Sequence, residues 1–209
     1  MNLEISQHAP LALRRCGAFL LLGIARTMLH ERVFLIGLRA SGKSSLGKLL
    51  AEHMSAAFVD ADVVAVDCLS CPISDLVERE GWPAFRELET TILDEIATRP
   101  GPLVIATGGG VVLDPANRER MREAGIVVYI EASAEVLADR LCSDLQPGQR
   151  PSLTGCSPVE EVAQVLAERE SLYKDTAHIV VNGEMPLDQL VADLAARLEA
   201  DPQQEGVDS

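Results

Sequence analysis

The chain has 209 residues, which suffices for one ordinary domain and is short for two. Hydrophobic residues make up 47% of it, so it can bury a core, but aromatic residues make up only 3% and packing must rest on aliphatic side chains. The formal net charge of -14 argues against nucleic acid as a partner, because no basic stripe is present to neutralise phosphates. A small phosphate ligand stays open, since a few cations in a cleft set the local potential.

Residues 1–27 differ in character from the rest of the chain. An arginine pair precedes the apolar run 16–25, which has the outline of a short signal peptide but is too short to span a bilayer, so we expect no membrane association. Met28 stands five residues before the first predicted strand, and we interpret 1–27 as a dispensable N-terminal extension. We expect one domain over 28–200 and a flexible polar tail over 201–209.

Five cysteines occur without regular spacing, which fits a reduced, cytoplasmic protein better than a disulfide scaffold. Cys68 and Cys71 form a lone CxxC pair. A zinc site would need a second pair or a histidine nearby, so we interpret these cysteines as incidental.

From residue 33 onward, short apolar runs alternate with helical patterns. The runs predict strands at 33–36, 57–59, 103–106, 126–130 and 178–181. The apolar spacing predicts helices at 43–54, 73–80, 83–98, 134–142, 158–171 and 187–199. Asp114 before Pro115 is typical of a further helix start. Buried strands that alternate with helices predict an α/β fold, a three-layer α/β/α sandwich with a five-stranded parallel sheet. Ligands of such sheets bind beyond the carboxyl ends of the strands.

A complete phosphate-loop pattern, G-x-x-x-x-G-K-[ST], runs from Gly37 to Ser44 between a predicted strand and a predicted helix. Its backbone N–H groups and the helix dipole favour phosphate oxygens, Lys43 supplies charge, and the Ser44 hydroxyl is a Mg²⁺ ligand. We therefore expect ATP to contact Arg39, Ala40, Ser41, Gly42, Lys43, Ser44 and Ser45. Arg39 either adds charge near the phosphates or points to solvent.

Two carboxylates follow the second predicted strand. Asp60 stands directly after it, where a phosphate-loop enzyme places an acid that helps to hold Mg²⁺. Asp62 lies two residues further on and faces the same cleft if the chain stays extended. The alternative is that both are turn or cap residues, because aspartate is common where strands end.

Six motifs together resemble the shikimate kinase family, small kinases with the P-loop NTPase fold of the nucleoside-monophosphate-kinase type. The resemblance covers residues 33–198. Its motifs are the phosphate loop, Phe58-Val-Asp-Ala-Asp62, Phe85-Arg-Glu-Leu-Glu89, Gly108-Gly-Gly110, Arg150-Pro151, and Glu168-Arg-Glu-Ser-Leu-Tyr173. Their shared order and spacing are more specific than any one of them.

The resemblance implies ATP-dependent phosphorylation of shikimate to shikimate 3-phosphate, a step of chorismate and aromatic amino acid biosynthesis, by a cytoplasmic monomer. Asp60 would assist Mg²⁺, and Asp62 would accept hydrogen bonds from the shikimate hydroxyls. The substrate carboxylate and ring would be held by Arg86, Arg169 and the backbone of Gly108, Gly109 and Gly110. A lid over about 143–157 would bring Arg150 to the phosphates, and Arg140 and Pro186 would flank adenine.

Two other functions stay open at this point. A gluconate kinase would share the phosphate loop and the aspartate after the second strand, although the paired arginines favour a cyclic acid. A non-catalytic sensor domain of a transcription regulator would need a DNA-binding segment, and residues 1–32 are too short for one. Val66, Ser70 and Trp82 depart from the family pattern, and we interpret them as drift that leaves room for an altered substrate.

Overall fold

The computed structural model describes residues 32–143 and 158–200. The predicted N-terminal extension, the predicted tail and the predicted lid beyond Ser143, with Arg150, lie outside the described residues. No helix of the described ranges is long and apolar enough to cross a membrane.

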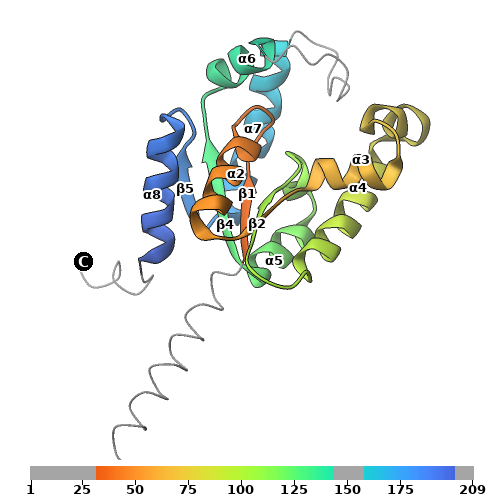
Figure 1. Ribbon diagram of the computed structural model, residues 1–209. Helices are drawn as coiled ribbons and strands as arrows, with labels where there is room; N and C mark the ends of the chain where they lie inside the picture. The colour runs from red at the N-terminus through yellow and green to blue at the C-terminus, as the bar shows by residue number, and fades with distance from the viewer. Residues whose placement is uncertain (1–31, 144–157, 201–209) are drawn as a thin grey trace, which may run out of the picture.

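The core of the molecule is a five-stranded, fully parallel sheet with the order β2-β3-β1-β4-β5 (Figure 1). Its strands are β1 (Arg32–Ile36), β2 (Ala57–Asp60), β3 (Leu103–Ala106), β4 (Ile126–Glu131) and β5 (Ile179–Asn182). The predicted parallel α/β sandwich is therefore confirmed. Because β1 is central, the loop that follows it lies between the loops that follow β3 and β4.

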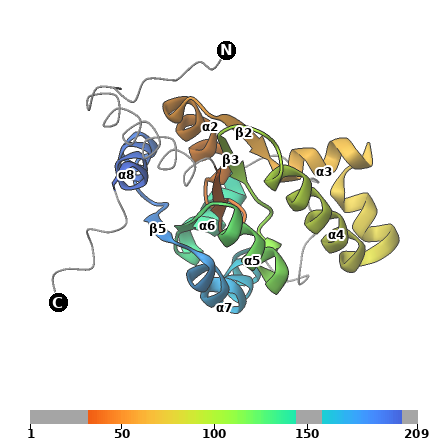
Figure 2. The same cartoon turned by 90° about the horizontal axis from the view of Figure 1, so that it is seen from below.

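Helices cover both faces of the sheet (Figure 2). One face packs against α2 (Lys43–Met54) and α8 (Leu187–Glu199). The other packs against α4 (Ile73–Ala97), α5 (Pro115–Ala124) and α7 (Pro158–Thr176). Alternate residues of the inner strands supply the two cores, because successive side chains of a strand point to opposite faces. In β1, Val33 and Leu35 enter the first core, whereas Phe34 and Ile36 enter the second.

A third, smaller apolar cluster lies beside the loop that follows β1. It joins Leu38 of that loop to α6 (Ala134–Ser143) and to α7, through Leu137, Val162 and Val165. A short 3-10 helix, η1 (Val111–Leu113), follows the glycine triplet after β3. The apolar cluster therefore fixes the first part of the loop against two helices.

The structure contains one helix that the sequence did not predict. Helix α3 (Ala61–Leu69) begins directly after β2, with Asp60 as its N-cap. The helices predicted at 73–80 and 83–98 are the two halves of α4, which are joined at Gly81, whose φ of 84° and ψ of 171° are not helical. Helix α5 begins as predicted, because the Asp114 side chain accepts a hydrogen bond from the Ala116 N–H at 2.8 Å.

His178 joins the starts of β4 and β5. Its ring nitrogen Nδ1 accepts a hydrogen bond from the Val127 backbone N–H at 3.0 Å, and the His178 backbone N–H donates to Val127 O at 2.8 Å. Partial desolvation of the ring, and then the charge of Arg122, lower the pKa of His178 below its usual 6.5. The folded state thus binds fewer protons than the unfolded state, so the contribution of His178 to stability is complete above its usual pKa and is lost as the pH falls through its folded-state pKa.

We therefore expect the melting temperature to fall as the pH is lowered from about 7 to about 5, and to fall less in His178→Gln. Thermal unfolding followed by circular dichroism across this range measures both slopes. His53→Gln, which changes the histidine of α2 and leaves the contact of His178 with Val127 intact, serves as the control and should keep the wild-type slope. An unchanged slope in His178→Gln would contradict the assignment.

Candidate active site

The phosphate loop connects β1 to α2 at the carboxyl end of the central strand. Gly42 is the N-cap of α2 and has a φ of 97°, while Ala40 has a φ of 63°. Both values lie in the left-handed region, which glycine adopts readily and alanine only with strain. Helix α2 begins at Lys43, so its unpaired N–H groups and the positive end of its dipole face the loop. The predicted setting of the motif, between strand and helix, is confirmed.

Lys43 lies inside the loop that it follows. Its side chain is largely buried, and Nζ donates to Gly37 O at 2.9 Å and to Leu38 O at 2.8 Å. These contacts hold an ammonium group at the loop that the motif assigns to phosphate. The lysine therefore both supports the loop and supplies its positive charge.

Ser44 and Asp60 bring two oxygen ligands together. Ser44 Oγ donates to Asp60 Oδ2 at 2.6 Å, and Asp60 Oδ1 accepts a hydrogen bond from the Asp62 N–H at 3.0 Å. Asp60 is thus a helix cap, as the alternative interpretation held, and its other carboxylate oxygen contacts the Ser44 hydroxyl. A hydroxyl and a carboxylate side by side fit Mg²⁺, which takes one or two protein oxygens and completes its shell with water and substrate phosphates. Among the described residues, no group of three or more His, Cys, Asp or Glu could form a separate metal site.

A pocket opens beside this loop, with an empty volume of about 450 Å³ that includes its mouth. Its lining combines three arginines and two carboxylates with apolar walls and the glycine triplet: Leu38, Arg39, Asp62, Ile73, Trp82, Phe85, Arg86, Glu89, Gly108, Gly109, Gly110 and Arg169. The structure thus gathers all the substrate-binding residues that the resemblance implied.

Arg86 of α4 is held on two sides. Its Nη1 donates to Glu89 Oε2 at 2.5 Å, and its guanidinium carbon lies 5.3 Å from the ring centre of Trp82, within cation–π range. Trp82, one of the departures from the family pattern, therefore lines the pocket and contacts Arg86. A Cβ on Gly110 would overlap Arg86 Nη1, so a side chain at this position would displace the guanidinium.

Glu89 is the last residue of the motif Phe85-Arg-Glu-Leu-Glu89, and the sequence alone assigns it no role. Its side chain is only 6% exposed, and its Oε1 is buried without a hydrogen-bond partner among the described residues. Desolvation raises the pKa of Glu89 above its usual 4.5, while the charge of Arg86 opposes that rise. The three-residue spacing from Arg86 was the signal that could have found it, because such residues share one face of a helix.

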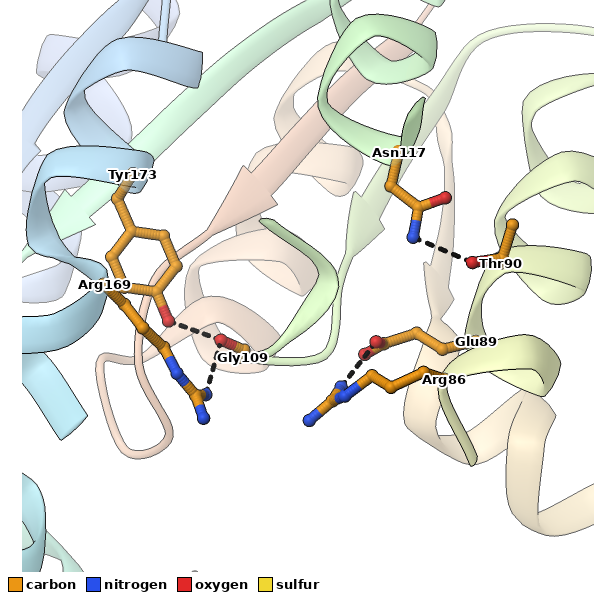
Figure 3. Close-up of polar contacts among 7 residues, drawn as sticks. All are labelled: Arg86, Glu89, Thr90, Gly109, Asn117, Arg169 and Tyr173. Carbon is orange, nitrogen blue, oxygen red and sulfur yellow. Dashed lines mark hydrogen bonds and ion pairs between the residues drawn. The ribbon is translucent and has the colours of Figure 1, made fainter. Parts of the chain in front are cut away.

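Arg169 of α7 faces Arg86 across the glycine turn (Figure 3). Its Nη1 donates to Gly109 O at 3.1 Å, and the Tyr173 hydroxyl donates to the same oxygen at 2.5 Å. Arg169 is only 8% exposed, and its Nε is buried without a partner among the described residues. Two guanidinium groups from different helices therefore border one pocket.

Three other predicted nucleotide contacts lie within the described residues: Arg39, Arg140 and Pro186. Arg39 forms an ion pair with the buried Glu161 of α7, so its guanidinium is not directed to solvent. Arg140 of α6 donates through Nη2 to Gly183 O at 2.8 Å, and through Nη1 to Ala40 O of the loop at 3.5 Å. It thereby bridges the phosphate loop and the turn that leads to Pro186, the N-cap of α8. Their contacts with ATP stay predictions, as does the role of Arg150.

Glu89→Gln is expected to raise the KM for the acid substrate about tenfold and to leave the KM for ATP unchanged, because a hydrogen bond to a charged group contributes about 1.5–3 kcal/mol and glutamine retains part of it. Steady-state kinetics with each substrate varied in turn measures both constants. Glu87→Gln, an exposed residue of the same helix, is the matched control. Equal kinetics in the two variants would show that Glu89 does not position Arg86.

Comparison with known proteins shows the family of the chain. The family model described as shikimate kinase matches residues 39–199. The chain is 49% identical over 156 residues to a shikimate kinase of Oleidesulfovibrio alaskensis, covering 75% of this chain and 90% of that protein. It is 46% identical over 167 residues to a shikimate kinase of Nitratidesulfovibrio vulgaris, covering 80% and 95%. The solved shikimate kinase of Acinetobacter baumannii in complex with shikimate superposes with a TM-score of 0.71 at 31% identity, covering 80% of this chain and 89% of that one. The chain belongs to the shikimate kinase family.

Proposed function

We propose that this protein transfers the γ-phosphoryl group of ATP to shikimate, giving shikimate 3-phosphate and ADP in the route to chorismate and the aromatic amino acids. The observation that carries the proposal is the convergence of Arg86, Arg169 and Asp62 on one pocket that also borders the phosphate loop. Two guanidinium groups suit a carboxylate, a carboxylate suits hydroxyl groups, and the loop suits a nucleotide phosphate. Shikimate carries the first two of these groups on one ring.

On the acceptor side, Arg86 and Arg169 bind the carboxylate of shikimate, each in a geometry fixed by a neighbour. Glu89 holds the guanidinium of Arg86, and Gly109 O holds that of Arg169. Asp62 accepts hydrogen bonds from the ring hydroxyls and orients the one that is phosphorylated. Orientation dominates over proton removal, because phosphoryl transfer passes through a loose transition state with little need for a strong base.

On the donor side, the loop from Arg39 to Ser45 binds the phosphates of ATP. Lys43 stabilises the negative charge of the transferred group, and Arg150 adds a second cation. Mg²⁺, held by Ser44 and Asp60, supplies charge neutralisation when bound. Arg140 and Pro186 flank the adenine. We further propose that the protein acts as a monomer in the cytoplasm.

The test is an assay of ADP release with ATP and Mg²⁺, run with shikimate, with gluconate and without an acceptor. The proposal predicts shikimate-dependent release, a product with one added phosphate by mass spectrometry, and loss of turnover with a Mg²⁺ chelator. Turnover on gluconate alone would assign a related sugar-acid kinase. Shikimate binding without turnover on either acceptor would indicate a sensor.

A further inference from the structure

The buried face of α7 that borders the glycine turn carries two hydrogen-bond donors directed at one acceptor. Arg169 and Tyr173 are four residues apart, so they lie on the same side of the helix. Both donate to Gly109 O, Arg169 at 3.1 Å and Tyr173 at 2.5 Å (Figure 3). A carbonyl oxygen has two lone pairs, so these two donors satisfy it.

We propose that Tyr173 is a positioning residue of the phosphoryl transfer reaction, which fixes the Gly109 carbonyl and through it the guanidinium of Arg169. The proposal rests on the role of Arg169 in binding the substrate carboxylate. The guanidinium donates to Gly109 O, and its Nε is buried without a partner in the described part of the chain. The direction of that carbonyl, together with the Tyr173 hydroxyl beside it, therefore sets the orientation of the guanidinium.

The Tyr173 ring is itself immobilised. It is fully buried, and it stacks on Tyr129 of β4 with ring centres 5.1 Å apart and an angle of 16° between the ring planes. Burial raises the pKa of Tyr173, so its hydroxyl stays protonated and remains a donor across the working pH range. A rigid ring with a permanent donor is suited to fixing a loop carbonyl.

The same bond acts on the glycine turn. Because the peptide unit is planar, fixing the direction of the Gly109 carbonyl also fixes the direction of the Gly110 N–H. Gly110 in turn lies against the Arg86 guanidinium, where a side chain would collide. The Tyr173 hydroxyl thus orders a turn that borders both arginines, although Tyr173 is not among the residues that line the pocket.

Tyr173→Phe tests the proposal, since it keeps the ring and its stacking and removes only the hydroxyl. We expect the KM for shikimate to rise about 2- to 10-fold, the range that one net hydrogen bond provides, with kcat and the KM for ATP changed by less than about twofold. Tyr129→Phe is the matched control. This control removes the hydroxyl of the stacked ring but leaves the hydrogen bond from the Tyr173 hydroxyl to Gly109 O in place. We expect Tyr129→Phe to keep wild-type kinetics.

A double-mutant cycle separates positioning from general destabilisation. If Tyr173 acts through Arg169, Tyr173→Phe raises the KM in the wild-type background but adds nothing in an Arg169→Ala background. Additive effects, or equal KM values for Tyr173→Phe and wild type, would overturn the proposal. An Arg169→Ala variant with a wild-type KM would instead refute the substrate role of Arg169, so the two failures are distinguishable. Circular dichroism confirms that each variant is folded.

Discussion

Replacing Lys43 by alanine is expected to lower kcat about 10³-fold, because preorganised positive charge at the transferred phosphoryl group is a major source of transition-state stabilisation. The ammonium group lies 2.8–2.9 Å from two carbonyl oxygens of the phosphate loop, at Gly37 and Leu38. The loop itself thus holds the ammonium group close to where the motif places the phosphates. Steady-state assays at saturating ATP and shikimate give kcat directly.

The control for this variant is Lys48→Ala, which removes an exposed lysine from the same helix and should keep wild-type activity. Lys43 also supports the loop, so nucleotide binding has to be measured beside turnover, for example by calorimetric titration with ADP. Loss of kcat with measurable ADP binding supports a transition-state role. A kcat within tenfold of wild type would contradict that role.

Asp62→Asn is expected to lower kcat about 10²- to 10³-fold, in the range attributed to a positioned acid or base group. Asp62 lies in the first turn of α3 and lines the pocket. Asparagine keeps the shape of the side chain but offers the substrate hydroxyl a neutral acceptor. The helix start is retained, since its cap is the bond from the Asp62 backbone N–H to Asp60 Oδ1.

Asp67→Asn, at an exposed position near the end of the same helix, is the matched control and should leave kcat unchanged. If Asp62 only orients the hydroxyl, the pH dependence of kcat persists in Asp62→Asn at a lower level. If Asp62 also removes the proton, the acidic limb of the profile disappears. Wild-type kcat in Asp62→Asn would show that neither role applies.

Most of the fold could be predicted because its strands are short apolar runs bounded by turn residues. Helix α3 was missed for a physical reason. Three valines, Val63, Val64 and Val66, are β-branched and disfavour a helix locally, and the residues of α3 are largely apolar. The Asp60 cap and the packing of Ala65 into the core override this local preference. The break in α4 was predicted correctly because Gly81 and Pro83 interrupt the helical pattern.

The site could be predicted less completely than the fold. Motifs identified the residues that border the pocket, but they could not show which side chains hold one another in place. The pairing of Arg86 with Glu89 lies within one helix, so its spacing was readable. The contact of Arg169 with Gly109 joins residues 60 positions apart, and the Arg39–Glu161 pair spans 122 positions. Such contacts depend on how α7 packs on the sheet, which local patterns do not specify.

The most direct test of the proposed pocket is a titration of the intrinsic fluorescence with shikimate. Trp82 is the only tryptophan of the chain, and it lines the pocket beside Arg86. The proposed site predicts a saturable fluorescence change with shikimate, absent with gluconate, whose dissociation constant rises in the Arg169→Ala variant. A protein that turns over shikimate with no fluorescence change, or with equal affinity in that variant, would place the substrate elsewhere.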